Sequence, residues 1–154
     1  MDISRILSPQ CTATTVTANS RKRVLEAASD LIADAHSELS GRRLFDELMS
    51  RERLGSTGIG DGVAIPHCRL DCSEILGAMI VLEHAVDYDA IDDEPVDLLF
   101  VLVVPKEETS AHLELLAALA RVFSVSENRQ ILRSSRTGSE LHQQLVGLFS
   151  SEAA

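Results

Sequence analysis

Two segments in the first third of the chain carry apolar residues at helical spacing. One follows Ser20 and the other follows Ser40, and serine is a residue type that caps helix N-termini. The positions predicted to face the core are Val24, Leu25, Ala28, Leu31, Ile32 and Ala35 in the first helix, and Leu44, Phe45, Leu48 and Met49 in the second. We expect the second helix to end just before Gly55, with Arg51 in its last turn.

Apolar runs without helical spacing predict the strands. Residues 75–83 form one such run. Residues 96–104, VDLLFVLVV, form another, which is rich in β-branched residues and predicts a strand buried on both faces. Residues 12–17 alternate like a short strand. Val63–Ile65 is typical of a short buried strand that Pro66 stops, because proline cannot continue a hydrogen-bonded ladder.

Three helices are predicted in the last third of the chain. The first has Thr109 or Ser110 as its N-cap, the second covers residues 126–132, and the third covers residues 140–149. The residues expected to face inward are Leu113, Leu116, Ala117, Ala120 and Phe123 in the first of these helices, and Leu141, Leu145 and Leu148 in the last.

The order of the elements and the chain length together predict the fold class. Strands interleaved with helices indicate an α/β fold. The 154 residues are the size of one domain with one core, so we expect a single layered domain over residues 1–150. Residues 151–154 are expected to form a short disordered tail.

Charge and cysteine content narrow the partners and the compartment. Asp and Glu number 24 against 14 Lys and Arg, and the net charge of −10 argues against non-specific binding to nucleic acid or anionic membranes. Proteins are the expected partners. Three cysteines without a framework pattern predict reduced thiols. No signal peptide and no run of roughly 20 apolar residues is visible, so we expect a soluble, cytoplasmic protein without membrane insertion.

Candidate chemistry concentrates in the stretch RERLGSTGIGDGVAIPHCR, which runs from Arg51 to Arg69. Its four glycines allow positive φ, so consecutive N–H groups can form an anion-sized concavity. Ser56 and Thr57 add hydroxyl donors to the same loop. His67 follows at the expected strand end, where a neutral imidazole is an available nucleophile. The nearby cations are Arg51, Arg53 and Arg69. The stretch therefore suits a phosphoryl group carried by His67.

His112 is the second candidate, because it falls in the first turn of the helix that follows residues 96–104. Helix N-termini attract anions and disfavour protonation of a nearby imidazole, so a neutral His112 can hydrogen-bond a phosphoryl oxygen. On the residues alone, an ordinary surface histidine is the simpler interpretation.

Residues 58–68, GIGDGVAIPHC, resemble the signature of the type-2 enzyme IIA domain of the bacterial phosphotransferase system. The longer strings RERLGSTGIGDGVAIPH and YDAIDDEPVDLLFVLVVP are more similar to its nitrogen-regulatory branch than to its mannitol or fructose branch. The resemblance runs from about Ile3 to Leu148, and it implies the mannitol-type enzyme IIA fold, a mixed β-sheet flanked by helices. Cys68 stands where glycine is more usual in this branch.

The resemblance also implies a role for each candidate residue. His67 would be the phosphorylated nucleophile, reacting through Nε2, and His112 would be the second active-site histidine. Arg51 would contact the phosphoryl group, with a planar fork that suits two phosphate oxygens. Ser56 and Thr57 would help to bind phosphate. No metal or other cofactor is implied.

By the same resemblance, the chain is a phosphohistidine carrier, a phosphotransferase component whose role is mainly regulatory. It would accept its phosphoryl group from an HPr-like phosphocarrier of the nitrogen branch, and its targets would be proteins of the potassium transporter or sensor kinase type. No transporter domain follows on this chain, which favours regulation. The alternatives are a sugar-transport enzyme IIA that passes phosphate to a separate IIB, or an interaction module that is not phosphorylated.

Two further interpretations fit the residues less well. A metal site of His67, Cys68, Cys72 and His84 matches no common zinc spacing. A nucleotide site at the glycines of GIGDG would need them between a strand and a helix, whereas here they precede a strand.

Overall fold

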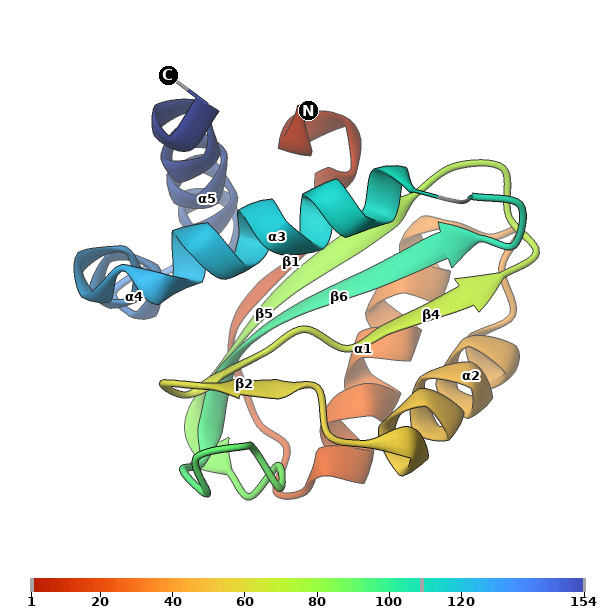
Figure 1. The fold of residues 1–154 in the computed structure, drawn as a ribbon, viewed down its shortest axis with the longest axis horizontal. Helices are drawn as coiled ribbons and strands as arrows, with labels where there is room; N and C mark the ends of the chain where they lie inside the picture. Colours follow the sequence, from red (N-terminus) through yellow and green to blue (C-terminus); the bar gives the residue numbers. More distant parts are fainter. Residues whose placement is uncertain (1, 109, 154) are drawn as a thin grey trace.

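The computed structural model of the protein describes residues 2–108 and 110–153, and in it a six-stranded mixed sheet forms the centre of the molecule (Figure 1). Its strands are β1 (Leu7–Val16), β2 (Gly58–Gly60), β3 (Val63–Ala64), β4 (His67–Leu70), β5 (Leu76–Val86) and β6 (Val96–Pro105). The order along the sheet is β1-β5-β6-β3-β2, and β4 also pairs with β6. The predicted α/β fold with a mixed sheet is confirmed.

Strand β6 pairs on both of its edges. It lies antiparallel to β5 on one side, and parallel to β3 and β4 on the other. All of its residues are buried except the half-buried Asp97. The sequence prediction of a strand buried on both faces is therefore confirmed, and this strand is the centre of the core.

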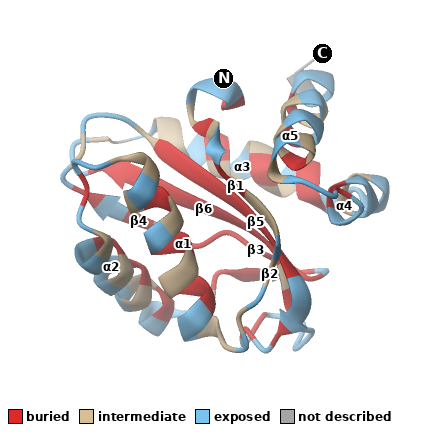
Figure 2. Cartoon of the chain, turned by 180° about the vertical axis from the view of Figure 1, so that it is seen from behind, coloured by how far each residue is buried: buried red, intermediate tan, exposed pale blue. Residues whose placement is uncertain are grey.

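Helices cover both faces of the sheet. The elements are η1 (Ile3–Arg5), α1 (Arg21–Ala35), α2 (Gly41–Leu54), α3 (Ala111–Ser124), α4 (Ser126–Arg133) and α5 (Gly138–Ala153). The paired helices α1 and α2 lie on one face, and α3 crosses the opposite face (Figures 1 and 2). In the described part of the chain, no helix combines the length and the apolarity that crossing a membrane requires.

The first two helices begin where the sequence predicts. The Ser20 hydroxyl accepts a hydrogen bond from the backbone N–H of Arg23 at 3.1 Å, and the Ser40 hydroxyl accepts one from Arg43 at 3.2 Å. These side chains satisfy backbone donors that have no partner inside the helix. The second helix ends at Leu54, directly before Gly55, as expected.

Helix α3 buries a different face from the one predicted. Its buried residues are Leu115, Leu119, Val122 and Phe123. Of the predicted inward residues only Phe123 is buried, and Leu113 is 58% exposed. The helix is apolar nearly all round, so two stripes match helical spacing and the spacing alone does not choose between them. Of its two predicted N-caps, Thr109 lies outside the described residues, and Ser110 makes no side-chain capping bond.

His67 begins a strand, whereas the sequence predicted it at the end of one. The chain leaves the ladder after β3 at Ile65 and Pro66, then rejoins β6 as β4 with His67 opposite Leu102. Proline has no N–H to donate, which explains the break. The two short strands thus run beside the same partner on either side of Pro66.

Strand β1 and helix α5 are both longer than predicted. The strand begins at Leu7, well before the alternating residues 12–17, and it tolerates Pro9 because it is an edge strand. The helix continues to Ala153, into the segment predicted to be disordered. Its last turn is held to α3 by the ion pair between Arg121 Nε and Glu152 Oε1, at 2.6 Å. Residue 154 lies outside the described residues.

Gly138 is the first residue of α5 and lies against β1. A Cβ atom at this position would stand 2.3 Å from the carbonyl oxygen of Thr12. Gly147 lies in the same helix, and a Cβ there would meet nothing within 4 Å. The two glycines therefore separate the effect of close packing from the effect of helix propensity.

We predict that Gly138→Ala destabilises the protein by about 1–3 kcal/mol, because backbone atoms have to move to admit the methyl group. Gly147→Ala should instead stabilise it by roughly 0.5–1 kcal/mol, the usual gain for alanine in a helix. Urea denaturation gives both values. Equal effects of the two substitutions would contradict the close approach of α5 to β1.

Candidate functional site

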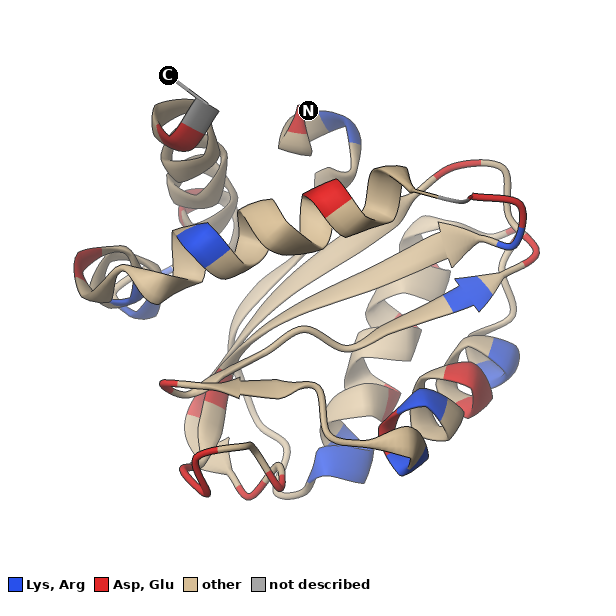
Figure 3. Ribbon diagram, in the orientation of Figure 1, with Lys and Arg blue, Asp and Glu red and all other residues tan. Residues whose placement is uncertain are grey.

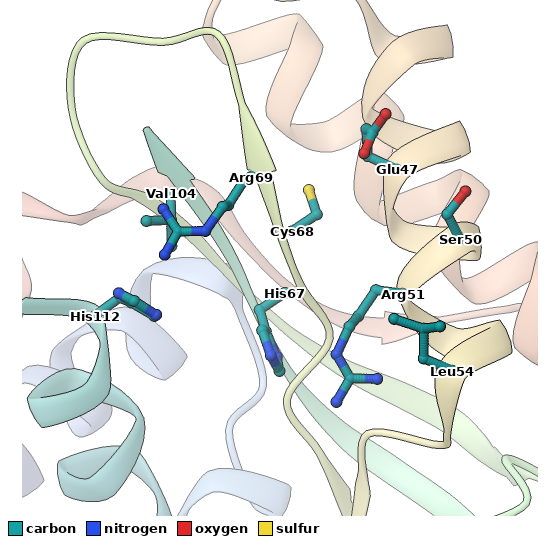
Figure 4. Close-up of a pocket in the computed structure, with 9 residues that line it drawn as sticks. All are labelled: Glu47, Ser50, Arg51, Leu54, His67, Cys68, Arg69, Val104 and His112. Carbon is teal, nitrogen blue, oxygen red and sulfur yellow. The ribbon is translucent and has the colours of Figure 1, made fainter. Parts of the chain in front are cut away.

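A cavity of about 390 Å³ lies between α2, β4 and the start of α3 (Figure 4). Its lining residues are Glu47, Ser50, Arg51, Leu54, His67, Cys68, Arg69, Val104 and His112. It brings together three of the residues predicted from the sequence, His67, His112 and Arg51. They come from three elements: the first position of β4, the first turn of α3, and the last turns of α2.

His67 is held in one orientation by a hydrogen bond to its own chain. Its Nδ1 lies 2.8 Å from the carbonyl oxygen of Ile65. A carbonyl oxygen can only accept, so Nδ1 carries the hydrogen and donates it. In the neutral ring, Nε2 is then the nitrogen with the free lone pair. Nε2 is thus the ring nitrogen of His67 that is available to a ligand or an electrophile.

The pKa of His67 is lowered from its ordinary value of 6.5. Burial is the main cause, because it disfavours the charged ring, and the nearby Arg51 and His112 act in the same direction. The hydrogen bond to Ile65 and the charge of Glu52 oppose the shift. His67 is therefore mainly neutral near pH 7, which is the state that can attack.

Arg51 keeps much of its guanidinium free for a ligand. Its Nη1 donates to the carbonyl oxygen of Gly55 at 2.8 Å, at the C-terminal end of its own helix. Among the described residues, its other two nitrogens have no hydrogen-bond partner. The side chain reaches toward the His67 ring in the close-up view (Figure 4). This geometry leaves donors that suit an anion beside His67.

His112 presents an unpaired ring nitrogen. Its Nδ1 is buried and, within residues 2–108 and 110–153, has no hydrogen-bond partner. Buried polar atoms are nearly always paired, so the unpaired Nδ1 sets apart His112, one of the residues that line the cavity. The helix that carries it is capped by Glu108, whose Oε1 accepts from the N–H of Ala111 at 3.1 Å.

Arg69 connects β4 to the loop that leads into α3. Its Nη1 donates to the carbonyl oxygens of Pro105 at 3.1 Å, Lys106 at 3.2 Å and Glu108 at 2.6 Å. The sequence marked Arg69 only as a nearby cation. Its acceptors are backbone atoms 36 to 39 residues away, and these leave no signal in the sequence.

The cavity is locally more cationic than the chain as a whole. Arg51 and Arg69 line it, whereas Arg53, the third expected cation, is exposed elsewhere on α2 and does not. Figure 3 shows cations at the start of α1, along α2 and on β4, while the turn between β5 and β6 is acidic. A chain with a net charge of −10 thus still offers positive charge next to His67.

Ser56 and Thr57, the predicted phosphate-binding residues, are not brought to the cavity. The Ser56 hydroxyl donates to the carbonyl oxygen of Tyr88 at 2.8 Å. Thr57 is buried, and both its N–H and its hydroxyl donate to the carboxylate of Glu52. In this structure the two hydroxyls hold the loop in place, because acceptors inside the protein take their hydrogen atoms.

The glycine-rich segment forms a hairpin, and it does not form the predicted anion concavity. Strands β2 and β3 flank Asp61, which has a φ of 58°, and Gly62, which has a φ of 79°. The N–H of Asp61 donates to a carboxylate oxygen of Asp92 at 3.0 Å, so an acidic side chain occupies the turn. The glycines here serve the tight turn and do not line the cavity.

Helix α2 contributes residues that the sequence analysis did not select. Glu47 and Leu54 lie one turn from Arg51 and line the same cavity, so helical spacing from Arg51 was the signal that could have found them. Ser50, which also lines the cavity, directly precedes Arg51 in the chain. Burial raises the pKa of the Cys68 thiol to about 12, and the nearby Glu47 adds to the shift. Cys68 is therefore protonated near pH 7 and is a poor competitor of His67 as a nucleophile.

The possible metal site does not assemble in the described part of the chain. No group of three or more His, Cys, Asp or Glu side chains there is placed to hold a metal ion. His67 and Cys68 thus have no further ligand in Cys72 or His84.

Comparison with known proteins gives the family. A family model described as the phosphoenolpyruvate-dependent sugar phosphotransferase system, EIIA 2, matches residues 5–146. The chain is similar to a nitrogen regulatory protein of Pseudomonas aeruginosa, with 44% identity over 145 residues that cover 94% of each protein.

Solved structures agree with this result. The crystal structure of nitrogen regulatory protein IIA-Ntr from Neisseria meningitidis matches with a TM-score of 0.83 and 36% identity, over 96% of this chain and 98% of that one. IIA mannitol from Escherichia coli shares the fold, with a TM-score of 0.69 and 14% identity over 84% and 91% of the two chains. The chain therefore belongs to the type-2 enzyme IIA family of the phosphotransferase system, within its nitrogen-regulatory branch.

Proposed function

We propose that this chain carries a phosphoryl group on Nε2 of His67 and acts as a phosphorylation-dependent regulator. One observation carries the proposal: a neutral, oriented His67 lines the same cavity as His112 and as Arg51, whose guanidinium has free donors. The donor would be an HPr-like phosphocarrier, as the family implies.

The transfer uses groups already in place. The Nε2 lone pair of His67 attacks phosphorus in line, while the P–N bond of the donor phosphohistidine breaks and its electron pair returns to the donor ring. Nδ1 of His67 keeps its hydrogen throughout, and the Ile65 carbonyl stabilises the charge that develops on the ring. Arg51 and His112, which line the same cavity, would donate to the phosphoryl oxygens. Passing the group on reverses these steps.

Regulation follows from the added charge. A phosphoryl group brings a charge of about −2 to the surface around His67, which is enough to make or break a protein interface. The exposed Leu54 and Leu113 stand at this cavity and next to His112, so the phosphoryl group would sit within a surface able to contact proteins. The regulated targets would be of the potassium transporter or sensor kinase type, in line with the nitrogen-regulatory branch.

The first prediction concerns the acceptor. Incubation with phosphoenolpyruvate, enzyme I and the HPr-like carrier of the nitrogen branch should add one acid-labile phosphoryl group, seen by intact mass. His67→Ala should abolish the addition, because it removes the nucleophile. His84→Ala, at an exposed position on β5, should leave it intact. Normal phosphorylation of His67→Ala would show that the proposal is wrong.

The second prediction concerns pH. The lowered pKa of His67 means that acceptance should persist as the pH falls through 6.5, and should be lost only at lower pH, when the ring becomes protonated. An NMR titration of the His67 ring and initial transfer rates should show the same midpoint. A midpoint at or above that of histidine in an unstructured peptide would contradict the structure.

The third prediction concerns Arg51. Arg51→Ala should slow transfer roughly ten- to a hundred-fold, because hydrogen bonds from a charged donor to the phosphoryl oxygens are lost. Arg53→Ala removes the same charge from the same helix outside the cavity, so it is the matched control and should transfer normally. Rates come from quench-flow with the phosphorylated carrier. Equal effects of the two substitutions would remove Arg51 from the site.

A further inference from the structure

Glu52 is a buried carboxylate one residue from Arg51, and its residue is only 3% exposed. Its Oε2 accepts from the N–H of Thr57 at 3.1 Å, and its Oε1 accepts from the hydroxyls of Thr57 and, at 2.9 Å, of Tyr88. Arg21 of α1 lies 3.7 Å from Oε2, which pairs the buried charge. A carboxylate so far from water persists only with such partners.

A hydrogen-bond chain leads from this carboxylate to the nucleophile. Thr57, which donates twice to Glu52, accepts at its carbonyl oxygen from the N–H of Ile65 at 3.0 Å. Ile65 in turn accepts at its carbonyl oxygen from Nδ1 of His67 at 2.8 Å. Each residue in the chain is fixed from both sides, so the position of the Ile65 carbonyl depends on where Glu52 holds Thr57.

The same loop also holds the side chain of Arg51 in position. The N–H of Gly55 donates to the backbone carbonyl of Glu52 at 3.1 Å, and the carbonyl of Gly55 accepts from Arg51. Residues 55–57 therefore connect to both reactive side chains, and Glu52 is the group on which this loop converges. Glu52 itself is not among the residues that line the cavity.

We propose that Glu52 is a positioning residue for His67, acting through Thr57 and Ile65 to keep the hydrogen on Nδ1 and the lone pair on Nε2. This inference rests on the proposed function, because it concerns how the ring of the proposed nucleophile, His67, is oriented. It also gives the Thr57 hydroxyl a task inside the protein in place of phosphate binding.

The chemistry of a carboxylate fits this task. Its two oxygens only accept, and here they receive three hydrogen bonds from Thr57 and Tyr88. An amide in the same place would turn an NH₂ group toward one of these donors. Burial and the charge of Glu52 raise the pKa of Tyr88, so the phenol keeps the hydrogen that it donates.

Two substitutions at Thr57 test the hydrogen-bond chain from Glu52 to His67 separately from the size of the side chain. Thr57→Val keeps the size of the side chain but removes its hydroxyl, whereas Thr57→Ser keeps the hydroxyl. We expect Thr57→Val to lower the kcat of phosphoryl transfer roughly ten- to a hundred-fold, without raising the KM for the carrier, because the ring loses its orientation. Thr57→Ser should restore most of the rate.

NMR of the unphosphorylated protein gives a readout that a purely structural role would not move. The ¹⁵N shifts of the His67 ring should report the hydrogen on Nδ1 in wild type and in Thr57→Ser, and a mixture of tautomers in Thr57→Val and Glu52→Gln. The double variant Glu52→Gln/Thr57→Val should transfer the phosphoryl group no more slowly than the slower single variant, because both substitutions break the same hydrogen-bond chain. Urea denaturation identifies variants that have unfolded. Should Glu52→Gln not fold, the comparison of Thr57→Val with Thr57→Ser still tests the proposal.

The outcomes separate this inference from the proposed function. An unchanged tautomer with a normal kcat in Thr57→Val overturns the positioning role, while phosphorylation of wild type on His67 would still stand. A raised KM with an unchanged tautomer also overturns it, since Thr57 would then act on the phosphoryl group or the carrier. If wild type accepts no phosphoryl group, the proposed function fails, and the tautomer comparison still tests the chain from Glu52 to His67.

Discussion

The pairing of β6 on both edges is the constraint on which the rest of the structure depends. This strand fixes β5 on one side and both β3 and β4 on the other, so it holds the segment that carries His67. The chain then leaves β6 at Pro105 and enters α3 within a few residues, which brings His112 to the same end of the sheet. A strand without an exposed edge or face has little freedom to shift, and the two histidines inherit that rigidity.

Electrostatics in the cavity work against the overall charge of the protein. The two arginines and the start of α3 offer positive potential, while Glu47 and the buried Glu52 stand close by. The carrier role proposed above would require the site to release a phosphoryl group as well as accept it, and a site of mixed charge suits that role better than a purely cationic one. The pKa of His67 is lowered mainly by burial, and Arg51 adds to the shift because it disfavours a second positive charge beside it.

Sequence patterns predicted the helices and strands better than they predicted the contacts between side chains. The apolar run at β6 and the serine caps of α1 and α2 are local signals, and local signals decided those elements. The buried face of α3 was wrong because an almost wholly apolar helix offers two equivalent stripes. Thr57 was assigned to phosphate because its acceptor, Glu52, carries no mark of burial in the sequence. Among the described residues, the hydrogen-bond acceptors of Arg69 are distant backbone atoms, which leave no pattern in the sequence.

The interruption of the ladder at Ile65 and Pro66 affects which ring nitrogen of His67 carries the hydrogen. Where a strand runs on without a break, its carbonyls are taken up by neighbouring strands. Because the chain leaves the ladder here, the Ile65 carbonyl is spared from sheet pairing and can receive Nδ1 of His67, while the Pro66 carbonyl resumes the ladder by accepting from Leu102. A single gap in a β-ladder thus determines which nitrogen of the His67 ring carries the hydrogen. Proline makes the gap permanent, since it has no N–H with which to close it.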